Sequence, residues 1–106
     1  MKIFIVEDDL VIAESLANEL SKWNYEVHVV DNFEKIMEDF RRVEPQLVLL
    51  DINLPTLNGF HWCQEIRKVS RVPIMFISSR TDNMDQILAI QMGGDDFIEK
   101  PFNLSL

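Results

Sequence analysis

The sequence predicts an α/β fold in which five parallel strands form one doubly wound sheet, in the order 2-1-3-4-5. Apolar runs of strand length alternate with segments of helical period along the chain. The first, third and fourth runs are continuously apolar, which is typical of strands buried on both faces. The second run alternates and the fifth is short and mixed, as edge strands are. Right-handed crossovers between parallel strands then favour this order.

The strands are expected near residues 2–6, 25–30, 46–50, 73–78 and 95–99. Between them, helices are expected near residues 9–22, 33–43, 59–69 and 83–92, because apolar side chains recur there at a spacing of three or four. Side chains suited to capping helix N-termini lie near the four starts, at Asp9, Asn32, Asn58 and Asp82. We read Asp9 as a cap and leave it out of the candidate site described below.

Length and composition indicate one domain over residues 1–106, with 47% apolar residues to form a core. The net charge of −8 repels phosphate backbones and anionic membranes, so the chain itself is not expected to bind nucleic acid or lipid. The single Cys63 excludes an internal disulfide, and no Cys/His cluster has zinc-site spacing, which suits the cytoplasm. No membrane span or signal peptide is expected, and the mature chain is expected to begin at Met1.

Acidic residues follow two of the buried strands, Glu7-Asp8-Asp9 after the first and Asp51 after the third. Parallel strands place these ends at one edge of the sheet, beside the point where the chain reverses direction. Like charges gathered there destabilise the fold unless a cation compensates them. Mg²⁺ is the natural cation, since it takes oxygen ligands. Asp8 and Asp51 are predicted to bind it directly, Glu7 through water, and Asn53 through its backbone carbonyl.

A carboxylate can also attack phosphorus and form an acyl phosphate, and Asp51 ends a buried central strand. Such an attack needs positive charge and donors near the phosphoryl oxygens. Lys100, after the fifth strand, offers an ammonium group, and Ser78, at the end of the fourth, offers a hydroxyl. The alternative for Ser78 is an ordinary turn hydroxyl.

The ordered set of these motifs resembles the receiver domain of bacterial two-component response regulators, which has a flavodoxin-like fold. The resemblance rests on Val6-Glu7-Asp8-Asp9, Leu50-Asp51-Ile52-Asn53-Leu54-Pro55, Gly59, Ile77-Ser78-Ser79-Arg80 and Asp95-Asp96-Phe97-Ile98-Glu99-Lys100-Pro101-Phe102. It implies that Asp51 is the phosphoacceptor, that Glu7, Asp8 and Asp51 hold Mg²⁺, and that Lys100 contacts the phosphate. It also implies switch roles for Ser78, where threonine is frequent, and for Phe97, where tyrosine is frequent. The alternative for Phe97 is plain core packing.

The segment Gly94-Asp95-Asp96-Phe97 and Lys100-Pro101-Phe102 resemble the winged-helix (OmpR/PhoB-like) transcription factors, especially regulators that sense antimicrobial peptides in Gram-positive bacteria. That resemblance implies a sensor histidine kinase as donor and, when the domain is phosphorylated, a homodimer through the 83–92 helix and the last strand. A fifth helix should follow Pro101-Phe102, so the chain is expected to be a receiver truncated before that helix. DNA would be bound only by a C-terminal domain that this chain lacks.

These residues distinguish three functional classes. A signalling switch that phosphorylates itself and slowly loses the group, rather than a metabolic enzyme, is favoured. A phosphorylation-independent pseudo-receiver would be expected to lose one of Glu7, Asp8, Asp51 or Lys100, and all are present. An aspartyl phosphatase would want a second acid at position 53, which is Asn, and a flavin domain would want a phosphate-cradling loop where the acids lie.

Overall fold

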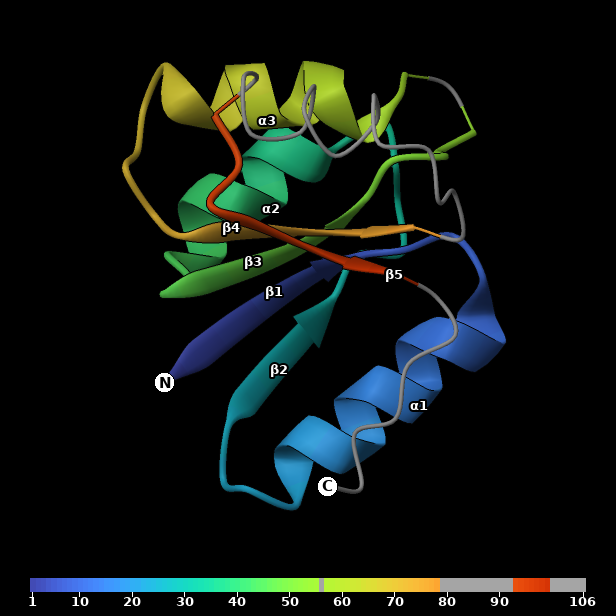
Figure 1. The fold of residues 1–106 in the computed structure, drawn as a ribbon. Helices are drawn as coiled ribbons and strands as arrows, with labels where there is room; N and C mark the ends of the chain where they lie inside the picture. The colour runs from blue at the N-terminus through green and yellow to red at the C-terminus, as the bar shows by residue number, and fades with distance from the viewer. Residues whose placement is uncertain (56, 79–92, 100–106) are drawn as a thin grey trace.

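A parallel sheet forms the centre of the computed structural model (Figure 1). Its strands are β1 (Lys2–Val6), β2 (Glu26–Val29), β3 (Leu47–Asp51), β4 (Ile74–Ser78) and β5 (Asp96–Glu99). They lie in the order β2-β1-β3-β4-β5, all parallel. The predicted parallel arrangement 2-1-3-4 is confirmed, and β5 pairs with β4 beyond it. The observed strand ends differ from the predicted ones by at most one residue.

The structure describes residues 1–55, 57–78 and 93–99, and for residues 78 and 96–99 it describes the backbone alone. The predicted helix over 83–92, its cap Asp82 and Lys100 lie outside these residues. Within the described ranges, no helix has both the length and the apolar content needed to cross a membrane.

Three described helices cover the two faces of the sheet: α1 (Leu10–Ser21), α2 (Ile36–Val43) and α3 (Gly59–Arg67). In Figure 1, α1 lies on one side of the sheet, and α2 and α3 lie on the other. The buried side chains divide in the same way, because neighbouring residues of a strand point to opposite faces. Leu16 of α1 packs with Ile3, Ile5, Leu49 and Ile77.

The core on the opposite face is larger and joins α2 and α3 to alternate residues of the central strands. Its members include Phe4, Val6, Ile36, Phe40, Val48, Leu50, Cys63, Ile66, Ile74 and Phe76. Strands β1, β3 and β4 therefore contribute apolar side chains to both cores, which explains why each reads as a continuous apolar run.

The predicted start of the second helix and its cap are wrong. Helix α2 begins at Ile36 rather than at residue 33, and Lys35 precedes it without a side-chain capping bond. The Asn32 carboxamide instead accepts the Glu34 N–H at 3.0 Å, and the Asn32 carbonyl accepts the Lys35 N–H at 3.1 Å. Because asparagine can form such a turn with the backbone two residues on, Asn32 holds a turn that precedes the helix.

The other two caps within the described residues are confirmed. Asp9 accepts the N–H groups of Val11 and Ile12 at 3.0 and 3.4 Å, and Asn58 accepts the N–H of His61 at 3.0 Å. Both caps fix a helix start directly after a loop that leaves the carboxyl edge of the sheet. The loops that carry the candidate acids are thus anchored at their helical ends.

Candidate functional site

The sheet register brings the predicted acids to one level at its carboxyl edge. Val6 pairs with Leu50 between β1 and β3. Glu7 directly follows Val6 at the end of β1, and Asp51 directly follows Leu50 as the last residue of β3. One carboxylate oxygen from each of Glu7, Asp8 and Asp51 lies within 4.8 Å of the other two. The convergence predicted from the sequence is therefore present in the structure.

The three acids differ in their access to solvent. Asp51 is 2% exposed and Glu7 is 1% exposed, whereas Asp8 is an exposed residue. The cluster thus consists of two buried carboxylates with a third on the solvent side. Three neighbouring carboxylates repel one another, and an oxygen-preferring cation would relieve that repulsion.

The backbone around the acids is held by bonds from their own loops. The Asn53 N–H donates to Asp51 Oδ1 at 3.3 Å, and the Asp9 N–H donates to Glu7 Oε1 at 3.1 Å. Asn53 is exposed beside the cluster, where its backbone carbonyl was predicted to bind metal. Asp9 uses its side chain to cap α1, as predicted, which separates it from the other three acids.

Gly59 lets the first turn of α3 lie against the backbone of Asp51. A Cβ atom added to Gly59 would lie 2.2 Å from the Asp51 carbonyl oxygen and 2.9 Å from its carbonyl carbon. The Gly59 N–H donates to the Ile52 carbonyl at 2.8 Å, which fixes this close approach. Only glycine fits here, because any other side chain would displace the residue that ends β3. The sequence resemblance included Gly59, but this contact was not predicted.

The remaining predicted site residues are only partly described. Ser78 is the last residue of β4 and pairs with Glu99 of β5, one step beyond the pair between Asp51 and Ile77. Phe97 lies in β5 opposite Phe76. The structure gives the backbone of Ser78 and Phe97, and Lys100 lies outside the described residues, so their predicted roles are not tested.

Cys63 does not belong to the site. It is fully buried in the core under α3, and burial raises the pKa of its thiol to about 11. A thiol with so high a pKa is protonated at neutral pH and is a poor nucleophile.

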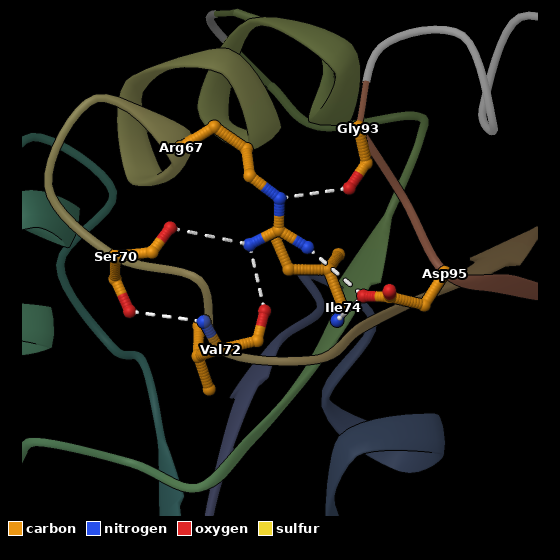
Figure 2. Close-up of polar contacts among 6 residues, drawn as sticks. All are labelled: Arg67, Ser70, Val72, Ile74, Gly93 and Asp95. Carbon is orange, nitrogen blue, oxygen red and sulfur yellow. Dashed lines mark hydrogen bonds and ion pairs between the residues drawn. The ribbon is translucent and has the colours of Figure 1, made fainter.

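Sequence reasoning missed a polar joint centred on Arg67, at the end of α3 (Figure 2). Its guanidinium donates to the Gly93 carbonyl at 2.9 Å, to the Val72 carbonyl at 2.7 Å and to Asp95 Oδ2 at 2.9 Å. The Ile74 N–H donates to the same Asp95 oxygen at 2.7 Å. Asp95 belonged to a segment used for the resemblance, but no spacing in the sequence connects it with Arg67.

Comparison with known proteins gives a consistent result. The family profile described as "Response regulator receiver domain" matches residues 3–106. BceR, a sensory transduction protein of Halalkalibacterium halodurans, is 47% identical over 105 residues, which are 99% of this chain and 46% of that protein. YvcP, an uncharacterized transcriptional regulatory protein of Bacillus subtilis, is 50% identical over 99% of this chain and 44% of its own length. The chain thus spans about half the length of these relatives.

A solved structure supports the same relationship. The N-terminal domain of the nisin resistance regulator NsrR, a lantibiotic response regulator, superposes with a TM-score of 0.89 and 49% sequence identity. The alignment covers 98% of this chain and 88% of that one. The fold, the acidic cluster and the family profile agree, and the chain belongs to the response regulator receiver domain family.

Proposed function

We propose that this domain accepts a phosphoryl group on Asp51 from a sensor histidine kinase, in the cytoplasm, and changes conformation in response. The observation that carries the proposal is the position of Asp51, which ends the buried strand β3 with Glu7 and Asp8 within 4.8 Å. A buried carboxylate at the carboxyl edge of a parallel sheet, next to two further acids, suits phosphoryl chemistry assisted by a divalent cation.

Glu7, Asp8 and Asp51 would hold Mg²⁺, together with the backbone carbonyl of Asn53. The donor set fits this ion, because it consists of oxygen ligands and contains no sulfur or imidazole group. Two buried acids and one exposed acid leave a solvent-facing side from which a phosphoryl donor can approach. When bound, Mg²⁺ supplies positive charge that neutralises the acids and the phosphoryl oxygens.

The reaction is an in-line transfer. A carboxylate oxygen of Asp51 forms a bond to phosphorus while the bond between phosphorus and the leaving group breaks, and the leaving group takes that electron pair. The leaving group is the kinase histidine or, with a small-molecule donor, acetate. Lys100 and Ser78 would bind the phosphoryl oxygens, as the resemblance implies. Slow hydrolysis of the acyl phosphate returns the domain to its starting state.

The output of the domain is a conformation rather than a metabolite. Phosphorylation replaces one negative charge by about two and adds three strong acceptor oxygens. These would draw Ser78 and Lys100 inward, let Phe97 change rotamer, and alter the surface formed by the 83–92 helix and the last strand. Homodimers formed there would control transcription through a C-terminal DNA-binding domain of winged-helix type, outside residues 1–106. The name of YvcP as a transcriptional regulatory protein, and the length of the relatives, support that arrangement.

The test is the intact mass of the protein after incubation with acetyl phosphate, with and without Mg²⁺. We expect a gain of one phosphoryl group that requires Mg²⁺ and is absent in Asp51→Asn. Asp31→Asn is the matched control, because it removes the same charge from an exposed residue outside the cluster. If the wild-type protein gained no mass under any of these conditions, a phosphorylation-independent interaction domain would replace this proposal.

A further inference from the structure

The joint around Arg67 fixes the place where β5 begins. Residues 93–95 lead into β5, and Arg67 binds the carbonyl of the first and the carboxylate of the last. The Asp95 N–H also donates to the Ile74 carbonyl at 2.8 Å, while the Ile74 N–H donates to Asp95 Oδ2 at 2.7 Å. The start of β5 is therefore bonded both to the end of α3 and to the start of β4 (Figure 2).

Gly93 is shaped to receive the Arg67 side chain. Its φ angle is +102°, in the region that favours glycine. A Cβ atom at Gly93 would also lie 3.0 Å from Cγ of Arg67 and 3.4 Å from its Nε. The stem of Arg67 thus packs closely against Gly93, where any other residue would be strained by the positive φ angle and would press on the Arg67 side chain.

The guanidinium suits this position better than an ammonium group would. The Arg67 side chain is only 16% exposed, so its charge needs partners, and Asp95 supplies the compensating one. Its planar fork reaches four acceptors in different directions, at Gly93, Ser70, Val72 and Asp95. Lysine has a single donor atom on a flexible stem and would not reach all four together.

Strand β5 is a short strand at the edge of the described sheet. It has four residues and pairs, within the described chain, with β4 alone. A shift of one residue along β4 would turn every side chain of β5 to the opposite face. The register matters for the candidate site, because Ser78 pairs with Glu99 and Lys100 is the next residue in the chain.

We propose that Arg67, with Asp95, is a positioning residue for phosphoryl transfer, because it sets the register of β5. Lys100, to which the proposed function gives the phosphoryl oxygens, is the next residue in the chain after that strand. The inference rests on the proposed function for its chemical consequence, while the register itself is a property of the fold. Arg67 acts through β5 and does not touch the reacting atoms.

The experiment uses Arg67→Lys and Asp95→Ala in the full chain. Ile66→Val is the control, because it removes one buried methyl group from α3 and leaves every polar group of the joint in place. The rate at which acetyl phosphate labels Asp51 should fall by about tenfold or more in both variants, since a displacement near 1 Å can cost about a hundredfold. The Kd for Mg²⁺, measured by titration calorimetry, should stay unchanged, because Glu7 and Asp8 follow β1 and Asp51 ends β3, and neither strand belongs to the joint. Ile66→Val should label at the wild-type rate.

Two further measurements separate positioning from general damage. In a Lys100→Ala background, Arg67→Lys should slow labelling by less than about twofold, since the lysine it positions is already gone. Amide hydrogen exchange at residues 96–99 should become faster in Arg67→Lys, while exchange in β1 and β3 stays slow.

Labelling of Arg67→Lys at the wild-type rate would overturn the inference. So would a slowing by Arg67→Lys that is as large in the Lys100→Ala background as in the wild-type protein. The failure of the proposed function is seen separately, as a wild-type protein that acetyl phosphate does not label. In that case the exchange measurement still decides whether Arg67 sets the position of β5, and unchanged exchange at residues 96–99 would refute it.

Discussion

Gly59→Ala tests most directly how the fold holds the phosphoacceptor. The new methyl group would lie 2.2 Å from the Asp51 carbonyl oxygen, where ordinary contact begins at 3.4 Å. The obstacle is main chain and cannot rotate away, so α3 or the end of β3 must move. The Ile52 carbonyl bond to the Gly59 N–H, at 2.8 Å, ties the two segments together and limits where that movement can go.

The size of the effect follows from this geometry. Overpacking by one methyl group costs about 1–3 kcal/mol, and the better helix propensity of alanine returns at most about 1 kcal/mol, so we expect a net loss of about 1–2 kcal/mol in unfolding free energy. A displacement of Asp51 by roughly 1 Å should slow phosphoryl transfer by about a hundredfold. The effect on rate should therefore be much larger than the loss of folded protein would explain.

The assay combines urea unfolding with the rate of labelling by acetyl phosphate in Mg²⁺, followed by intact mass. Ile66→Val is the control, because loss of one buried methyl group from α3 costs about 1 kcal/mol and leaves the Asp51 backbone alone. It should be destabilised to a similar degree and label at the wild-type rate. A folded Gly59→Ala protein that labelled as fast as Ile66→Val would show that the close contact at Gly59 does not position Asp51.

Three further perturbations test the cluster, the core and a cap. Asp8→Asn removes one of three neighbouring charges, so it should raise the Tm measured without Mg²⁺. It should also reduce the stabilisation by Mg²⁺, which is about 2.7 kcal/mol for the wild type at a hundred times its Kd. A variant whose Tm rises with Mg²⁺ as much as that of the wild type, in scanning calorimetry, would contradict the site. Cys63 has its pKa raised from 9.0 to about 11, so the folded state favours the protonated thiol, and the unfolding free energy should fall by roughly 2 kcal/mol as the pH rises from 9 to 11. Urea unfolding of Cys63→Ala should show a smaller fall over the same pH range. Asp9→Ala removes the hydrogen bonds to Val11 and Ile12 and should cost about 1 kcal/mol in unfolding free energy. Asp9→Asn keeps an acceptor and should stay near the wild type. Equal losses of unfolding free energy in the two variants would count against the cap.

The central part of the fold could be predicted because strands that are buried on both faces consist almost entirely of apolar residues. Strands β1, β3 and β4 face a core on both sides, so nearly every residue in them is apolar. Once their order is known, the meeting of Glu7, Asp8 and Asp51 follows from topology alone, since the carboxyl ends of parallel strands share an edge.

The features that could not be predicted depend on backbone partners. Asn32 suits a cap and a turn equally well, and the choice depended on whether its carboxamide met a turn N–H or a helix N–H. Arg67 and Asp95 are 28 positions apart, and most of the hydrogen bonds around them involve main-chain groups. Because every residue type carries such groups, the sequence does not reveal these partners. The contact of Gly59 with the Asp51 carbonyl is of the same kind.

The central place of β1 also affects the order in which the chain can fold during synthesis. Its Ile5 pairs with Val29 on one side and its Val6 with Leu50 on the other. At about 5–20 residues per second, the ribosome adds the 44 residues between Val6 and Leu50 in roughly 2–9 s. Throughout that interval one edge of an apolar strand has no partner. A chain truncated after Val43 should therefore aggregate faster, by turbidity, than the 106-residue chain. Of the five described strands, the first to be made is one that pairs with two strands made later.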